Sequence, residues 1–360
     1  MRGECFQTGS LNVGTCVIAL MNCSSDVAAL LAVTDDPELL CTAAEGLHLV
    51  STCTNTGSND HRISRQLDLL TILFNDRAVG RNLGAACTRV GLCAKFFQLN
   101  CERRPKRVAG VPPDYFSEDG QLWGNPLYRW HYLRLHGYGF WMDRLRAMAQ
   151  LYDSVRIDHF IGFANYYSVK AGEKTARNGK WVIGPGKAFF AAVKKKVPEL
   201  NVVAEDLGAV NDRVRNLLAF CGYPGMKVLQ FAYDGGGGDN SHQPQLYQPN
   251  CAAYTGTHDN DTSLGWWRAC SDQTRRNLRE ALGEVDDSTV VWRMIKAVFD
   301  SRANIAMAPM QDFLGLDSAA RMNTPGTVGE KNWRYRALSS DFSAELAARM
   351  RALCEESGRV

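Results

Sequence analysis

Short apolar runs rich in β-branched residues alternate with helical patterns in the part of the chain that follows Lys106. This alternation is typical of βα units built on a parallel sheet. It predicts strands at residues 154–157, 201–204, 226–233, 251–255 and 304–308, and helices at residues 186–197, 212–220 and 288–301. Before residue 105 the patterns are weaker, and we expect helices only at residues 26–33 and 67–75. We therefore expect an atypical, poorly ordered region at residues 1–105 and an α/β region at residues 106–350.

Acidic residues follow four of the predicted strands: Asp158, Glu205, Asp259 and Asp312. Any one of them is equally well explained as a helix N-cap, where aspartate is favoured. Four at separate strand ends are instead typical of a (β/α)8 TIM barrel, whose functional residues lie at the C-terminal ends of its strands.

Residues 154–163, SVRIDHFIGF, place Arg156 and Asp158 two positions apart in an extended run. Residues with this spacing point to the same side of a strand, so the guanidinium group and the carboxylate would be neighbours. A nearby cation favours the ionised carboxylate and keeps it available as a nucleophile at neutral pH. A buried structural salt bridge is the alternative for this segment.

Glu205 lies in VVAEDLGAV, directly after an apolar strand and beside Asp206. A glutamate at the edge of an apolar pocket and near other carboxylates has a raised pKa, which suits it to general acid catalysis. The alternative is that Glu205 or Asp206 caps the next helix.

Residues 254–267, YTGTHDNDTSLGWW, supply His258, Asp259 and Asn260 ahead of two tryptophans. A metal site is one interpretation, but a single histidine with carboxylates is weak evidence for it. Hydrogen bonding to vicinal hydroxyl groups beside aromatic faces is the better fit, which indicates a sugar site.

The net charge of +3 comes from 41 basic and 38 acidic residues that are interspersed, which argues against a nucleic-acid or membrane-surface partner. No apolar run reaches the roughly 18 residues of a membrane span, and the short run at residues 17–21 does not make a signal peptide, so we expect a cytoplasmic location. The 12 cysteines include no C-x-x-C pair, so we expect free thiols and neither a zinc site nor disulfides.

The segment at residues 109–130 adds aromatic side chains on a stretch stiffened by paired prolines: Tyr115, Phe116, Trp123, Tyr128 and Trp130. Flat aromatic faces suit the apolar faces of sugar rings, although a rigid surface loop that packs its own aromatics is the alternative. Two carboxyl groups with different tasks then match glycosidic bond chemistry, in which one attacks the anomeric carbon and the other protonates the leaving oxygen.

These segments together resemble one known family. From about residue 108 to residue 338 the chain is similar to the 4-α-glucanotransferases, also called amylomaltases or disproportionating enzymes. The resemblance rests on AGVPPDYFS, WGNPLY, VRIDHF, AEDLG, PGMKVLQFAYD, YTGTHDND, QDFLGLDSAARMNTPGT and NWRYR.

The resemblance implies a decorated (β/α)8 barrel of the glycoside-hydrolase type, with residues 106–350 as its catalytic portion, and transfer of α-1,4-glucan segments with retention. It implies glucans and malto-oligosaccharides as donors, glucose or an oligosaccharide as acceptor, and no cofactor or metal. By the same resemblance, Asp158 is the nucleophile, Glu205 the general acid/base and Asp259 the third carboxylate. The residues it assigns to substrate binding are Arg156, His258, Asp114, Tyr115, Phe116, Trp123, Asn260, Arg321 and Asn323.

One departure from the family concerns residues 1–100, which show no match to the earlier barrel strands and their tyrosine-bearing loop. We therefore expect a barrel that is incomplete at its N-terminal part. Two other functions stay open on the sequence alone: a related α-amylase-like retaining hydrolase, and a truncated, inactive chain that only binds glucan.

Overall fold

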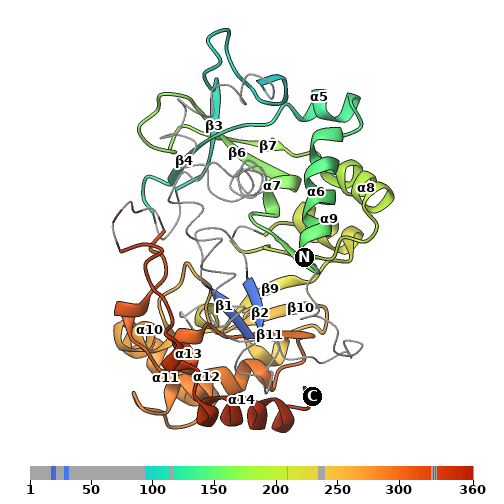
Figure 1. The fold of residues 1–360 in the computed structure, drawn as a ribbon. Helices are drawn as coiled ribbons and strands as arrows, with labels where there is room; N and C mark the ends of the chain where they lie inside the picture. Colours follow the sequence, from blue (N-terminus) through green and yellow to red (C-terminus); the bar gives the residue numbers. More distant parts are fainter. Residues whose placement is uncertain are drawn as a thin grey trace. The chain divides into compact units, whose positions relative to one another are not determined.

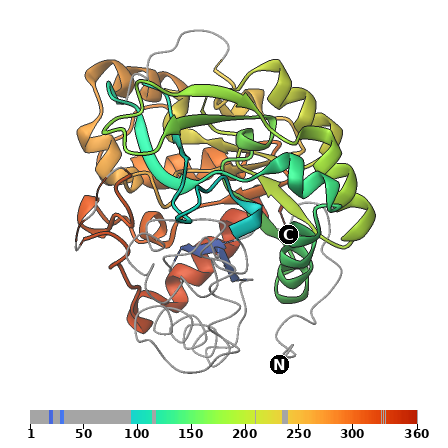
Figure 2. The same ribbon diagram turned by 90° about the horizontal axis from the view of Figure 1, so that it is seen from above.

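The computed structural model describes residues 18–21, 28–31, 94–113, 117–208, 210–233, 240–325, 327, 329 and 331–359. The chain forms two compact units (Figures 1 and 2). One is Ser58–Gly225, and the other, called here the C-terminal unit, combines Met1–Gly57 with Met226–Val360. The division expected at residue 105 stays a prediction, because most of residues 1–105 lie outside the described ranges.

An antiparallel sheet in the Ser58–Gly225 unit has the strand order β4-β3-β6-β7, with β3 (Arg107–Val111), β4 (Gln121–Pro126), β6 (Asn165–Lys170) and β7 (Lys180–Ile183). The proline-rich segment that sequence patterns indicated as a stiff loop therefore includes two paired strands. Gly110 is required at their contact, since a Cβ atom there would lie 2.4 Å from the carbonyl oxygen of Gln121. Trp123 lies on β4, at the point where the pairing of β4 with β3 shifts its register.

Parallel strands in the same unit follow the predicted βα pattern. β5 (Val155–Ile157) pairs with β8 (Val202–Ala204), and Ala204 pairs with Gly225 at the start of β9 (Gly225–Val228). The helical elements of the unit are η2 (Ala94–Phe96), α5 (Trp130–Leu135), α6 (Gly139–Leu151), α7 (Ile161–Ala164), α8 (Gly186–Lys196) and α9 (Asp212–Cys221). The predicted strands at 154–157 and 201–204 and helices at 186–197 and 212–220 are thereby confirmed.

Aromatic side chains form much of the core of this unit. Trp141 and Phe163 both pack against Phe189, with ring centroids 5.4 and 5.0 Å apart, and Phe189 packs against Phe190 at 5.0 Å. All four are buried. Rings at these separations and angles add favourable edge-to-face or offset contacts to the area they bury. These contacts pack α6, which carries Trp141, and α7, which carries Phe163, against α8. The helix α7 begins three residues after Asp158, which directly follows β5.

The C-terminal unit contains β9, β10 (Cys251–Tyr254) and β11 (Ile305–Met307) in that order, and β10 and β11 run parallel. Its helices are α10 (Ser263–Ala269), α11 (Asp272–Leu282), α12 (Val290–Phe299), α13 (Met310–Phe313) and α14 (Ala344–Glu356), with the short 3-10 turns η3 (Leu229–Ala232), η4 (Pro244–Leu246), η5 (Ser318–Ala320) and η6 (Ser339–Asp341). The helix predicted at residues 288–301 is confirmed as α12, and its core-facing side is apolar: Val290, Val291, Met294, Ile295, Val298 and Phe299 are buried. No described helix has both the length and the apolar character to cross a membrane.

Two sequence predictions about secondary structure were wrong. The strand expected over residues 226–233 ends at Val228, and η3 follows. This turn buries Leu229 and Ala232 and lets the Gln230 amide donate to the carbonyl oxygen of Asp261, a contact that periodicity does not reveal.

The helix expected at residues 26–33 is instead the strand β2 (Ala28–Leu31), paired antiparallel with β1 (Ile18–Met21). Eight residues are too few for a stable isolated helix, and pairing satisfies the same backbone groups. The helix expected at residues 67–75 lies outside the described residues.

The parallel sheet and its helices bear out the α/β class. A closed eight-stranded barrel is not found among the described residues, so its closure and the expected gap in it stay predictions.

Arg359 closes the end of α12. Its buried guanidinium group donates hydrogen bonds to the carbonyl oxygens of Phe299, Ser301 (2.8 Å) and Ala303 (2.9 Å). A cation at a helix C-terminus also interacts favourably with the helix dipole.

We expect Arg359→Met to lower the free energy of unfolding by about 2–4 kcal/mol, because three carbonyl groups, in two buried hydrogen bonds and one partly buried one, lose their donor. Urea denaturation of the full chain measures this loss. Arg302→Met, at an exposed position on the same turn, is the matched control. Equal stabilities for the two variants would contradict the role given to Arg359.

Candidate functional site

Arg156 and Asp158 form an ion pair at the end of β5. The Arg156 Nη2 donates to Asp158 Oδ1 over 2.8 Å, and the two side chains are 16% and 37% exposed. The predicted proximity of the two groups is confirmed. Because the carboxylate keeps access to solvent, it is available to a reacting group as well as to its cation.

Glu205 lies beside this pair because β5 and β8 are parallel and in register, with Ile157 opposite Ala204. Its Oε2 accepts the backbone N–H of His159 over 2.6 Å, and its Oε1 accepts that of Leu207 over 2.8 Å. Both oxygens of the carboxyl group are therefore held by the main chain, which fixes its orientation.

Burial, followed by the negative charge of Asp158, raises the pKa of Glu205 to about 7, against the opposing effects of Arg156 and the two N–H donors. The raised pKa expected from the sequence is thus borne out. The alternative that Glu205 or Asp206 caps the next helix is wrong: α9 is capped by Asn211, whose side chain accepts the backbone N–H of Val214.

His159 is a site residue to which the sequence patterns assigned no task. Its backbone has a φ of 46°, the left-handed region that residues other than glycine rarely adopt. Its ring meets Trp123 edge-on, with centroids 4.7 Å apart. Burial lowers the pKa of His159 to about 4, so the imidazole is neutral at pH 7. Its position directly after Asp158 in the motif was the only signal in the sequence.

Asp259 lies after β10 in the C-terminal unit and is held by three other candidate residues. Asn323 Nδ2 donates to Asp259 Oδ1 over 2.6 Å, and His258 Nε2 lies 3.5 Å from the same oxygen. Arg321 donates to the backbone carbonyl of Asp259 over 2.8 Å and to that of Asn323 over 2.8 Å. The structure thus brings Asp259, His258, Arg321 and Asn323 together, with the Asp259 side chain 49% exposed.

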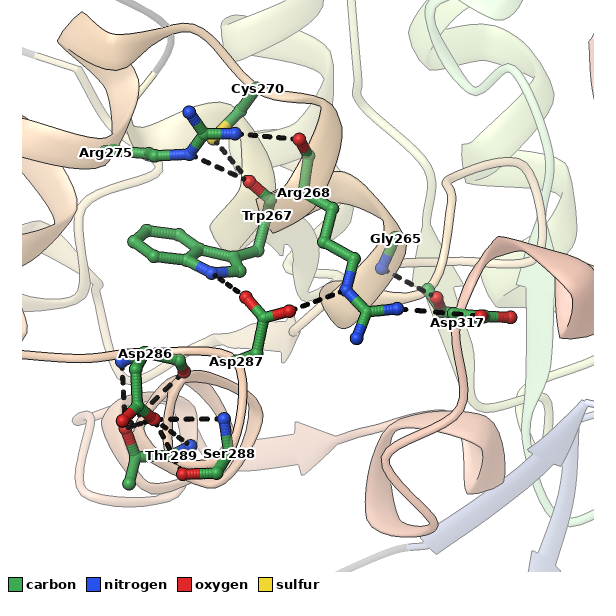
Figure 3. Close-up of polar contacts among 11 residues, drawn as sticks. Gly265, Trp267, Arg268, Cys270, Arg275, Asp286, Asp287, Ser288, Thr289 and Asp317 are labelled. Carbon is green, nitrogen blue, oxygen red and sulfur yellow. Dashed lines mark hydrogen bonds and ion pairs between the residues drawn. The ribbon is translucent and has the colours of Figure 1, made fainter.

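A polar network at the end of α10 supports this loop (Figure 3). Arg268 joins Asp287 at 2.8 Å to Asp317 at 3.6 Å, and Asp317 caps η5, the turn directly before Arg321. The Ser318 hydroxyl on η5 donates to Asp261 Oδ2 over 2.7 Å. The network therefore fixes the segment on which Arg321 and Asn323 approach Asp259.

Glycine at position 265 permits this close contact between α10 and η5. A Cβ atom there would lie 2.2 Å from the Ser318 hydroxyl oxygen and 2.8 Å from Asp261 Oδ1. Neither Ser318 nor Gly265 was singled out by the sequence, because their contact joins segments more than 50 residues apart.

Asn260 and Asp312 have structural partners. The Asn260 side-chain oxygen accepts the N–H and hydroxyl groups of Thr257, both over 2.9 Å, and so shapes the loop that carries Asp259. Asp312 is 1% exposed and accepts hydrogen bonds from Thr255 and from two groups of Ser263. Burial raises the pKa of Asp312. Of the four strand-end acids, Asp312 is therefore the one that holds core segments together.

Three of the predicted substrate-binding residues, Asp114, Tyr115 and Phe116, lie outside the described residues. Trp123 is described and lies against His159. Among the residues described, no group of histidine, cysteine, aspartate and glutamate side chains is arranged to hold a metal ion.

The chemistry available beside β5 and β8 follows from two carboxyl groups in different environments. Asp158 faces a cation, which favours its charged form, and Glu205 retains its proton up to about pH 7. Such a pair can supply a nucleophile and a proton donor in one step.

Comparison with known proteins shows which proteins this chain is similar to. The 4-alpha-glucanotransferase family model matches residues 91–340. The chloroplastic/amyloplastic 4-alpha-glucanotransferase of Arabidopsis thaliana is 45% identical over 268 residues, which are 74% of this chain and 46% of the plant protein. The 4-alpha-glucanotransferase of Clostridium butyricum is 44% identical over 265 residues, 73% of this chain and 54% of the bacterial protein.

The chain is also similar to a solved structure. The amylomaltase from Streptococcus agalactiae in complex with acarbose is similar with a TM-score of 0.71 at 33% identity, over 74% of this chain and 53% of that one. The chain spans about half the length of the curated relatives it matches.

Titration of the Glu205 carboxyl carbon tests the electrostatics of the site independently of any activity. In protein labelled with ¹³C-glutamate, with the resonance assigned by its loss in Glu205→Gln, we expect a midpoint near pH 7. Asp158→Asn removes a negative charge and lowers the midpoint, and Arg156→Met removes a positive charge and raises it. An unchanged midpoint in both variants would show that burial alone sets this pKa.

Proposed function

Because the chain belongs to the 4-alpha-glucanotransferase family, we propose that it transfers a segment of an α-1,4-glucan to the 4-hydroxyl group of an acceptor glucose or glucan. The observation that supports this most directly is the Glu205 carboxyl group, with a pKa near 7, beside the Arg156–Asp158 ion pair. The similarity to the amylomaltase solved with acarbose supports α-glucans as its substrate class. A (β/α)8 barrel is the proposed fold of the whole enzyme, and the cytoplasmic location stays a prediction.

The proposed reaction has two displacements. In the first, the Asp158 carboxylate attacks the anomeric carbon, the bond to the glycosidic oxygen breaks, and the Glu205 proton passes to that oxygen. In the second, the acceptor 4-hydroxyl attacks the same carbon, its proton returns to Glu205, and Asp158 leaves. Two inversions give net retention.

The protonation states suit this sequence. Asp158 is ionised for attack because Arg156 lies 2.8 Å away. Glu205 must act once as acid and once as base, and a pKa near the working pH makes both forms available.

For Asp259 we propose the third role, in which its carboxylate stabilises the transition state and binds sugar hydroxyl groups. Asn323 and Arg321 orient it, and His258 adds a neighbouring hydrogen-bonding group. Trp123 offers an aromatic face for the glucan, together with Tyr115 and Phe116 of the same segment.

Incubation with maltotriose tests the proposed function. Transfer gives glucose together with longer oligosaccharides, whereas an α-amylase-like hydrolase gives only maltose and glucose, and a glucan-binding chain without activity gives no products. Chromatography of the products separates the three outcomes, and only the first supports the proposal.

We expect Asp158→Asn to reduce the transfer rate on the order of 10³-fold or more while glucan binding is kept, because the covalent step loses its nucleophile. Asp153→Asn, an exposed neighbour, is the matched control. A rate within about tenfold of the wild type, equal to about 1.4 kcal/mol, would remove Asp158 from this role.

We expect Glu205→Gln to be slow on maltotriose but rescued in the first step by a glycosyl fluoride, whose leaving group needs no proton. The burst of released fluoride measures that step. Glu199→Gln, at an exposed position, serves as the control. Equal losses on both substrates would count against Glu205 as the acid.

A further inference from the structure

The backbone N–H of His159 donates a hydrogen bond to Glu205 Oε2, with 2.6 Å between nitrogen and oxygen. This is shorter than the 2.8 Å bond from the Leu207 N–H to Oε1 of the same carboxyl group. The two peptide segments are also joined directly: the Phe160 N–H donates to the Glu205 carbonyl, and the Glu205 N–H donates to the Ile157 carbonyl, both over 2.9 Å. The turn after Asp158 is therefore bound to Glu205 by main-chain and side-chain contacts.

The left-handed backbone of His159 points this N–H at Glu205. A φ of 46° is unfavourable for a residue with a Cβ atom, so contacts of the side chain must stabilise it. The ring supplies them: it meets Trp123 edge-on at 4.7 Å, and it lies so close to Gly162 that a Cβ atom there would be 2.9 Å from His159 Cδ2.

We propose that His159 is a positioning residue of the reaction: its ring, in contact with Trp123 and close to Gly162, stabilises the left-handed turn that directs its N–H to Glu205 Oε2. The proposal rests on the acid/base role proposed for Glu205. The imidazole itself exchanges no proton in this scheme, and the group that acts on Glu205 is the peptide N–H.

The direction of the effect follows from the groups that face Glu205. Asp158 raises its pKa, Arg156 lowers it, and the N–H groups of His159 and Leu207 lower it by binding the charged form. If the turn at residue 159 relaxes and its N–H leaves Oε2, the charged form loses a donor and the pKa rises. The acid then stays protonated to higher pH, which moves the basic limb of the rate profile upward.

Two substitutions at position 159 distinguish the effect of the backbone conformation from the effect of the ring contacts. Asparagine tolerates the left-handed region, whereas valine, which is β-branched, does not. We expect His159→Val to move both the basic limb of kcat/KM and the ¹³C midpoint of Glu205 to higher pH, and to lower kcat about tenfold, with KM within about twofold. His159→Asn loses the ring contacts but tolerates the left-handed region, so we expect its midpoint and limb to lie between those of the wild type and those of His159→Val.

The result that would overturn the proposal is the same Glu205 midpoint in His159→Val, His159→Asn and the wild type. If His159→Val does not fold, as judged by its far-UV circular dichroism, His159→Ala takes its place, since alanine also disfavours the left-handed region. Absence of transfer by the wild-type chain on maltotriose would remove the proposed function, but the ¹³C titration would still decide whether the His159 turn controls the pKa of Glu205.

Discussion

The parallel pairing of β5 with β8 is the contact on which the chemistry of the Ser58–Gly225 unit depends. It places Ile157 opposite Ala204, so that the residues which follow, Asp158 and Glu205, come from adjacent strand ends. A shift of one residue in this register would turn one of the two carboxyl groups to the other face of the sheet. The apolar residues of both strands, which are buried, make such a shift costly.

Two carboxyl groups at adjacent strand ends acquire different properties because their surroundings differ. Asp158 faces a guanidinium group and is 37% exposed, while Glu205 is more enclosed and sits beside the negative charge of Asp158. Burial is the larger cause of the raised pKa, and the neighbouring charge adds to it. Arg156 therefore affects both carboxyl groups. It favours the charged form of Asp158, and it limits the rise in the pKa of Glu205.

Asp259 is supported in another way. Its carboxylate is half exposed and is oriented by the amide of Asn323 and by His258, while its backbone carbonyl is bound by Arg321. These partners arrive on a segment that follows η5, and η5 is fixed by its Asp317 cap and by the contact between Ser318 and Asp261. Side-chain and backbone contacts from this segment thus fix the orientation of Asp259.

The sequence by itself determined the alternation of strands and helices after Lys106 and the positions of Asp158, Glu205 and Asp259 directly after apolar runs. These features depend on local periodicity and on short spacings, such as the two residues between Arg156 and Asp158, and such patterns can be recognised without a fold. The resemblance to a known family then suggested a catalytic or binding role for each of these residues. Contacts between residues that are distant in the chain could not be predicted from the sequence.

The tertiary structure alone decided that residues 229–232 form a turn, where buried contacts outweigh local propensity, and that residues 28–31 form a strand, where the pairing with β1 does so. It also showed that Asp312, in sequence one more strand-end acid, is a buried acceptor for Thr255 and Ser263. The left-handed turn at His159 and the two N–H groups that bind the carboxyl group of Glu205 were likewise absent from the sequence analysis. The hydrogen bond from His159 to Glu205 joins separate segments, and it does not exist until those segments have come together.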